Sequence, residues 1–156
     1  VMYDIACEVP DEQYCIPFGE ASFPRQGSDV TIVAISNMVT HAITVADILA
    51  KEGISCDVID PRTVSPLDHE AILESVEVTG RLVIIDEGNP RCGLASDIAG
   101  IVAEHGFYSL KVPIRTVTAP HTPVPFAPEL EDAYLPNADK LMVAVREVLA
   151  AGPSGA

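Results

Sequence analysis

The chain has 156 residues, a length that suits one domain with one hydrophobic core. Hydrophobic residues make up 48% and charged residues 21% of the sequence, so overall disorder is excluded. Nine Lys and Arg residues against 23 Asp and Glu residues give a net charge of −14. Because such a surface repels phosphate groups and anionic lipids, we expect no nucleic-acid partner, no membrane association, and basic protein partners.

No apolar run approaches the ~20 residues that cross a bilayer, and no basic start precedes an apolar stretch. Neither a transmembrane helix nor a secretory signal is therefore indicated. The cysteines form no C-x-x-C pair, which favours free thiols in a reducing, cytoplasmic compartment: Cys7, Cys15, Cys56 and Cys92. The start at Val1, without a cap, tag or targeting segment, suggests a piece of a longer chain.

The first residues of the chain carry prolines and acidic side chains, which predict a linker over residues 1–18. Residues Gly19–Gln26 then alternate weakly between apolar and polar. Gly27-Ser28-Asp29 predicts a turn that sends the chain back into Val30. Together these features predict an antiparallel edge strand, a position that tolerates a proline in a strand.

Beyond this turn, apolar runs typical of buried strands alternate with segments of helical periodicity. The strands are expected at Val30–Ile35, Ile54–Asp60, Arg81–Asp86 and Val112–Thr118. Four alternations of strand and helix predict a three-layer α/β/α domain. We assign this domain to residues 19–151, with a five-stranded, mostly parallel sheet and one antiparallel edge strand.

Each predicted helix has start and stop signals. Ser36 or Asn37 can cap the first helix, and Ser65-Pro66 opens the second with Pro66 in its first turn. The third helix follows the loop Glu87–Gly93, and a Pro-rich loop precedes the last helix, which Asn137 caps. The first three helices are expected to end at Gly53, Gly80 and Gly106, and residues 152–156 are expected to form a disordered tail.

Loops at the carboxyl ends of parallel strands are the usual ligand sites of such sheets. The loop Ser36-Asn37-Met38 has no glycine, which excludes a dinucleotide site there. In the loop Glu87–Gly93, Arg91 favours an anion but Asp86 and Glu87 oppose one. We therefore favour a structural role for the glycines of this loop, and a stand-alone module that binds a small anion is the alternative.

The histidines form no pair at metal-ligand spacing, so the sequence predicts no zinc site: His41, His69, His105 and His121. The first three are expected on polar helix faces. His121, in the Pro-rich loop, is a candidate for a loop that faces an active site, and a plain surface position is the alternative. No catalytic, cofactor-binding or metal-binding residue is predicted in this chain.

Seven stretches, taken in order, form one pattern: Tyr14–Ala21, Val30–Ile35, Asp60–Asp68, Thr79-Gly80-Arg81, Asp86-Glu87-Gly88, Pro123–Phe126 and Leu135-Pro136-Asn137. This pattern resembles the β subunit of thiamine-diphosphate-dependent 2-oxo acid dehydrogenases. The resemblance covers residues 3–150 and corresponds to the transketolase C-terminal-type domain of that subunit. It implies that residues 1–18 are the linker from a missing pyrimidine-binding domain.

The resemblance implies a parent E1 component that uses thiamine diphosphate and Mg²⁺, cleaves a C–C bond next to a carbonyl, and passes the acyl group to lipoyl-E2. The carboxylate that activates the cofactor belongs to the missing domain, so this chain alone is expected to be inactive and to bind no cofactor. The implied partners are the E1 α subunit, a second E1 β subunit, and the basic peripheral subunit-binding domain of E2.

Within that family, the loop Ala119–Pro125 resembles the acetoin-cleaving enzymes, because many relatives carry Asp or another residue in place of His121. We expect an acetoin or pyruvate dehydrogenase, and a branched-chain 2-oxo acid dehydrogenase is the alternative. Acidic residues near the end of the chain are candidate contacts for the basic E2 domain, or form a solvated face: Glu129, Glu131, Asp132 and Asp139.

Overall fold

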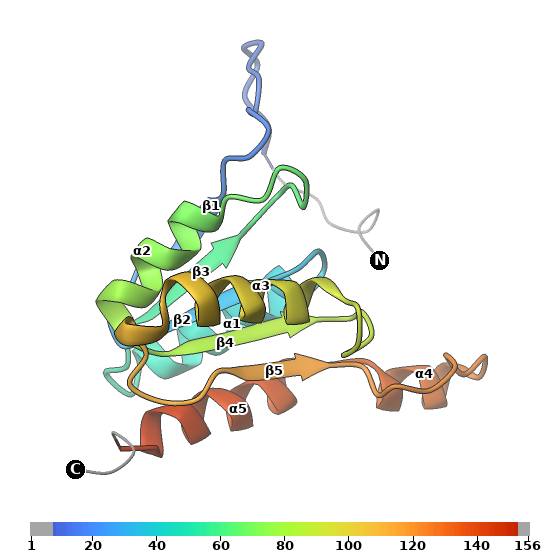
Figure 1. The fold of residues 1–156 in the computed structure, drawn as a ribbon. Coiled ribbons are helices and arrows are strands. Elements are labelled where there is room, and N and C mark those ends of the chain that lie inside the picture. The colour runs from blue at the N-terminus through green and yellow to red at the C-terminus, as the bar shows by residue number, and fades with distance from the viewer. Residues whose placement is uncertain (1–7, 153–156) are drawn as a thin grey trace.

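A five-stranded sheet in the order β1-β3-β2-β4-β5 forms the middle layer of the computed structural model, which describes residues 8–152 (Figure 1). The strands are β1 (Ser22–Arg25), β2 (Val30–Ala34), β3 (Cys56–Asp60), β4 (Leu82–Asp86) and β5 (Arg115–Thr118). Strand β1 is antiparallel to β3, and the other neighbouring pairs are parallel. The predicted mostly parallel sheet with one antiparallel edge strand is confirmed.

Helices cover both faces of this sheet (Figure 1). Helices α1 (Met38–Ala50) and α5 (Ala138–Ala150) pack on one face, and α2 (His69–Thr79) and α3 (Leu94–His105) pack on the other. A short 3₁₀ helix, η2 (Phe107–Ser109), follows α3, and α4 (Pro128–Tyr134) lies between β5 and α5. Within residues 8–152, none of the helices is both long and apolar enough to span a bilayer.

Strands β2 and β4, which are neighbours in the interior of the sheet, are buried along their whole length because helices cover both of their faces. Alternate residues enter opposite layers, as the two-residue period of a strand requires. Ile32 packs in the cluster beneath α1 and α5, whereas Val33 packs in the cluster beneath α2 and α3. Strand β4 repeats this alternation with Ile85 and Ile84. The continuous apolar runs of the sequence therefore supply two cores at once.

Strand boundaries and pairing differ from the prediction in small ways. Strand β3 begins at Cys56 rather than Ile54, and β5 begins at Arg115 rather than Val112. Pro113 has no N–H to donate to the ladder, which explains the late start of β5. The turn after β1 leads into β2, yet β1 pairs with β3. The edge position is set by this long-range pairing and not by a hairpin.

One predicted helix start was wrong, and at another helix the predicted start is correct but the side-chain cap is not formed. Helix α2 begins at His69, and Asp68 caps it by accepting a hydrogen bond from Ala71 N at 3.2 Å, so Pro66 precedes the first turn. At α1, neither candidate supplies a side-chain cap. Ser36 has a φ of 56°, and Asn37 already has helical dihedrals. At α2 the side-chain cap of Asp68 marks the start of the helix, whereas α1 begins without one.

The Pro-rich loop contains a helix that the sequence analysis missed. Helix α4 begins with Pro128 and carries Glu129 and Glu131 in its first turn. A proline needs no N–H partner in that turn, and acidic side chains there interact favourably with the helix dipole. The cap of the following helix α5 is confirmed, because Asn137 Oδ1 accepts a hydrogen bond from Lys140 N at 3.0 Å.

The cysteines of the described region are free, with Cys15 and Cys92 exposed and Cys56 buried. Cys7 lies outside the described residues. Burial, together with the negative charge of Asp29, raises the pKa of the Cys56 thiol to about 11. Because the thiolate is the reactive form, Cys56 is a packing residue and not a nucleophile.

Candidate functional site

The loops that follow β2, β3, β4 and β5 gather at one edge of the sheet, because these strands are parallel (Figure 1). We call this the carboxyl edge. Two adjacent hollows lie there and share Val64. One is lined mainly by the ends of β2 and β3 (Ile35, Ser36, Asp60, Pro61 and Arg62), and the other by the start of α3 (Cys92, Gly93, Leu94, Ser96 and Asp97).

The backbone at the carboxyl edge is strained in three places. Within residues 8–152, the non-glycine residues with positive φ are Ser36, Arg62 and Cys92, at 56°, 58° and 53°. Each follows a different strand and lines one of the two hollows. Such conformations cost of order 1–3 kcal/mol each and tend to cluster at functional regions. The strain therefore marks the carboxyl edge as the part of the domain shaped for a purpose other than stability.

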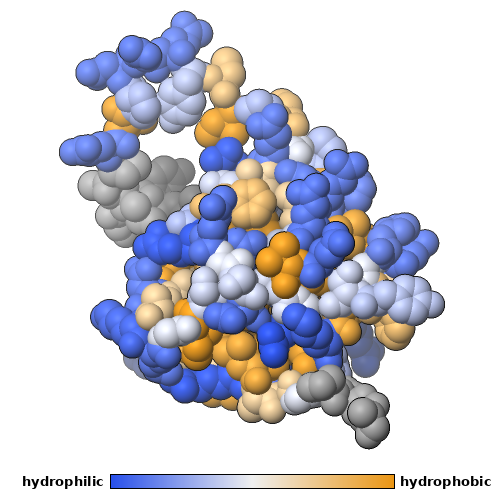
Figure 2. Space-filling view, turned by 90° about the vertical axis from the view of Figure 1, so that its left-hand side faces the viewer, coloured by the Kyte–Doolittle hydropathy of each residue, from blue (hydrophilic) through white to orange (hydrophobic). Residues whose placement is uncertain are grey.

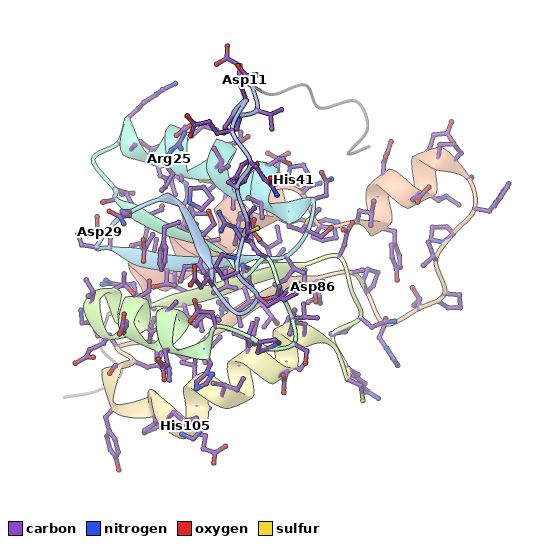
Figure 3. All side chains as sticks on the ribbon, turned by 90° about the horizontal axis from the view of Figure 1, so that it is seen from above. Asp11, Arg25, Asp29, His41, Asp86 and His105 are labelled. Carbon is purple, nitrogen blue, oxygen red and sulfur yellow. The ribbon has the colours of Figure 1, made fainter. Side chains whose placement is uncertain are left out.

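Asp86, the last residue of β4, organises the next loop (Figure 3). It is buried, and its Oδ1 accepts a hydrogen bond from Gly88 N at 2.9 Å. A Cβ on Gly93, at the other end of the loop, would collide with the carbonyl oxygen of Asn89. Both contacts support a structural role for the glycines of Glu87–Gly93, as the sequence suggested.

The histidines lie apart. Figure 3 shows His41 on α1 and His105 on α3, on opposite sides of the sheet. His69 is exposed at the start of α2. His121 is exposed in the loop after β5, where it lines a shallow hollow with Asn89, Thr122 and Pro123. In the part of the chain that the structure describes, no three His, Cys, Asp or Glu side chains are grouped to hold a metal ion.

Helix α4 is fixed from both sides. The buried Tyr134 donates a hydrogen bond from its hydroxyl to Thr122 O at 3.1 Å, which links α4 to the loop of His121. Lys140 Nζ donates to Ala133 O at 2.9 Å and to Leu135 O at 2.7 Å, which links α4 to α5. The short helix is therefore held in one position relative to the carboxyl edge.

Helix α4 and the loop before it present a mixed apolar and acidic surface. We define the α4 surface as Val124, Phe126, Glu129, Leu130, Glu131 and Asp132, all of them exposed. Phe126 is fully exposed. Asp139 is exposed nearby in the chain, in the first turn of α5. The acids were predicted as contacts from the sequence, but the apolar residues beside them were not. An aromatic side chain in a Pro-rich loop was the available signal for them.

On the opposite side of the molecule, where the parallel strands begin, hydrophobic residues are scattered among hydrophilic ones (Figure 2). Exposed aromatic residues at this end of the fold include Phe107 and Tyr108 of η2, whose ring centroids lie 5.6 Å apart. Strained loops and the α4 surface are features of the carboxyl edge. The candidate functional site is therefore the carboxyl edge together with the α4 surface.

Comparisons with known proteins agree with this architecture. The family described as "Transketolase, C-terminal domain" matches residues 19–141. The chain is 51% identical over 147 residues to the β subunit of acetoin:2,6-dichlorophenolindophenol oxidoreductase from Bacillus subtilis, covering 94% of this chain and 43% of the relative. The corresponding subunit from Cupriavidus necator is 50% identical over 151 residues, covering 97% and 45%.

A solved structure is similar as well. It is described as "Split gene transketolase, inactive beta4 tetramer" and has a TM-score of 0.75 and 30% sequence identity. The match covers 91% of this chain and 44% of that one. The chain thus spans less than half the length of the relatives that it matches.

Proposed function

We propose, because the chain belongs to the transketolase C-terminal domain family, that it is the C-terminal assembly and docking domain of a thiamine-diphosphate-dependent E1 β subunit. The observation that carries this proposal is the 51% identity, over 94% of the chain, to an acetoin oxidoreductase β subunit. In the proposed cytoplasmic parent complex, E1 cleaves a C–C bond next to a carbonyl, and the acyl group passes to lipoyl-E2.

Acetoin is the substrate that the comparisons favour. Identity is 50–51% with two acetoin oxidoreductase subunits, 37–42% with five pyruvate dehydrogenase subunits, and 38% with a 2-oxoisovalerate dehydrogenase subunit. His121 lies exposed beside Asn89 at the carboxyl edge. We place this histidine next to the active site of the assembled parent enzyme.

Thiamine diphosphate and Mg²⁺ are assigned to the parent enzyme and not to this domain. The described residues do not fit the cofactor, because the loop Ser36-Asn37-Met38 has no glycine to let a diphosphate approach the backbone. Nor do the described residues include a cluster of carboxylates for a metal ion. We therefore expect the isolated chain to be inactive.

The substrate assignment is tested with the complete β subunit and its α partner, using 2,6-dichlorophenolindophenol as electron acceptor. We expect dye reduction with acetoin to exceed that with pyruvate or 2-oxoisovalerate. His121→Asn should lower kcat/KM for acetoin, whereas His69→Asn, an exposed histidine at the start of α2, should not. A preference for pyruvate or 2-oxoisovalerate would contradict the acetoin assignment.

We propose three protein partners for the domain, which comprises residues 19–151 and is preceded by a linker over residues 1–18. They are the E1 α subunit, a second β subunit, and the basic peripheral subunit-binding domain of E2. The net charge of −14 and the exposed acids of the α4 surface and Asp139 suit the basic partner. Phe126, fully exposed among these acids, supplies an aromatic side chain of the kind that anchors interfaces.

The docking proposal predicts that binding of the E2 domain depends on the negative charge of α4 and not on equal charge elsewhere on the domain. The triple variant Glu129→Gln, Glu131→Gln, Asp132→Asn should weaken binding of the E2 domain by about tenfold, because acidic residues steer a basic partner. Its affinity should also depend less on salt. Calorimetric titrations at low and moderate ionic strength measure both effects.

The matched control removes the same charge from another helix. Glu70, Glu74 and Glu77 are exposed on α2, and their replacement by Gln should leave the affinity within about twofold. Phe126→Ala and Asp139→Asn test the aromatic side chain and the first turn of α5 separately. Equal losses in the α4 and α2 triple variants would place docking outside the α4 surface.

A further inference from the structure

The residues that lead into β1 are held by the loop between β3 and α2. Two backbone amides of this segment donate hydrogen bonds to side chains of that loop. Gly19 N donates to Thr63 Oγ1 at 2.9 Å, and Ala21 N donates to Asp68 Oδ2 at 2.8 Å. Both partners are more than forty positions away in the sequence, so the contacts are tertiary and not part of a local turn.

The two side chains that accept these bonds are themselves fixed. Thr63 Oγ1 donates to Pro66 O at 2.9 Å. Asp68 uses its other oxygen, Oδ1, to cap α2 through Ala71 N at 3.2 Å. Each side chain therefore joins the incoming chain to a second element.

The path of the incoming chain at Gly19 leaves little space. Gly19 has a φ of 78°, which favours glycine, and a Cβ at this position would lie 3.0 Å from Pro66 Cγ. Beyond Gly19, the arm (residues 8–18) rises away from the body of the domain (Figure 1). Tyr14, Ile16 and Phe18 of the arm are exposed. The domain thus holds residues 19–21, which we call the arm root, whereas the arm itself projects away from the sheet.

The loop between β3 and α2, which holds the arm root, also forms part of the carboxyl edge. Pro61, Arg62 and Val64, from the same loop, line a hollow there with Asp60 at the end of β3. We propose that Thr63 and Asp68 form an anchor that fixes the direction in which the arm leaves the domain relative to the carboxyl edge. The anchor goes beyond the proposed function, since it rests on contacts within this chain and holds for any partner.

Side-chain chemistry allows the anchor to be removed without removing the helix cap. In Asp68→Asn one oxygen remains and can still cap α2, but the amide nitrogen that replaces the other oxygen cannot accept from Ala21 N. Thr63→Val keeps the shape of the side chain and removes the hydroxyl, whereas Thr63→Ser keeps the hydroxyl. The double variant Thr63→Val, Asp68→Asn therefore releases the arm root selectively.

Proteolysis by a glutamate-specific endoproteinase provides the readout on the full chain. Glu20 lies between the two anchored amides, and Glu12 lies in the exposed arm, so each protein carries its own internal control. Under conditions in which the protein stays folded, the native chain should be cleaved after Glu12 much faster than after Glu20. In the double variant, cleavage after Glu20 should accelerate at least about tenfold, while the rate at Glu12 stays unchanged.

Two further single variants separate the anchor from general loosening. Thr63→Ser, which keeps the hydroxyl, should retain slow cleavage at Glu20, and Thr40→Val, which removes an exposed hydroxyl on α1, should have no effect. Amide exchange at Ala21 N should follow the cleavage rates. The anchor is refuted if the native chain is cleaved equally fast at Glu20 and Glu12. It is refuted also if the double variant keeps the native protection at Ala21 N.

Discussion

Gly27→Ala should destabilise the protein by about 3 kcal/mol, at the upper end for the insertion of one methyl group into a packed site. A Cβ at this position would collide with the carbonyl carbon of Cys56 and lie 2.6 Å from both Cys56 O and Ser55 C. These are backbone atoms at the start of β3, so no side-chain rotation relieves the overlap. The strand and the turn must move apart instead.

That movement would break the contacts that join the turn to β3. Gly27 N donates to Asp57 Oδ1 at 3.3 Å, Asp29 N donates to Ser55 O at 2.9 Å, and Ser55 N donates to Asp29 Oδ2 at 2.7 Å. The turn therefore sets where β3 begins, and its displacement should disturb the pairing of β3 with the neighbouring strands. Urea unfolding followed by circular dichroism measures the loss, read as a lower midpoint at an unchanged slope.

The same substitution at Gly100 is the control, and we expect it to raise the free energy of unfolding instead of lowering it. Gly100 lies within α3, is exposed, and would meet no atom within 4 Å if it carried a Cβ. Alanine in a helix interior is more favourable than glycine by roughly 0.5–1 kcal/mol, so Gly100→Ala should stabilise. If Gly27→Ala were neutral, the close approach of the turn to β3 would be refuted.

The main elements of the fold could be predicted because their signals are local and repeated. Four buried apolar runs give the parallel strands, and helical periodicity between them gives α1, α2, α3 and α5. The position of β1 was predicted from a weak alternation, but its pairing with β3 depends on residues more than thirty positions away. Such a pairing cannot be deduced from the turn alone.

The errors in the helices come from competition between signals. In α4, Pro128 and the acids after it favour a helix start, but surrounding prolines favour a loop. At α2, Pro66 and Asp68 are both acceptable start residues. In the structure Asp68 is the cap, and its second carboxylate oxygen also accepts from Ala21 N. The cap residue of α2 thus also takes part in a tertiary contact, which the sequence pattern does not reveal.

The candidate site was predictable only in its charged part. Glu129, Glu131 and Asp132 stand out in the sequence because they are close together in an acidic chain. The apolar side chains beside them gain meaning only from exposure, which depends on how Tyr134 and Lys140 hold α4. Neither Thr63 nor Asp68 carries a sequence signal for an anchor, because hydrogen bonds to distant amides leave no periodic pattern.

A second large effect is expected from a chain of buried hydroxyl groups that ends on a carboxylate. Ser75 on α2 donates to Asp57 Oδ2 on β3. Because a serine hydroxyl has one hydrogen, Thr31 must donate to Ser75 Oγ, which it approaches at 2.7 Å. Thr79 Oγ1 in turn lies 2.7 Å from Thr31 Oγ1. All four side chains are buried, so water is a poor substitute for any of them.

Ser75→Ala should therefore cost about 2–3 kcal/mol of unfolding free energy. The variant leaves the buried Asp57 Oδ2 without the hydroxyl that donates to it, and Thr31 loses Ser75 Oγ as a partner. Ser28→Ala is the matched control, because Ser28 is exposed in the turn, and its effect should stay within about 0.5 kcal/mol.

A double-mutant cycle separates the hydrogen bond from the loss of packing. If the penalty arises from an unpaired carboxylate, Asp57→Val combined with Ser75→Ala should cost less than the two single changes added together, by about 1 kcal/mol or more. If the penalty arises from the space left by the Ser75 hydroxyl, the two changes should add. Simple additivity would mean that the polar chain is a passive feature of packing between α2 and the sheet.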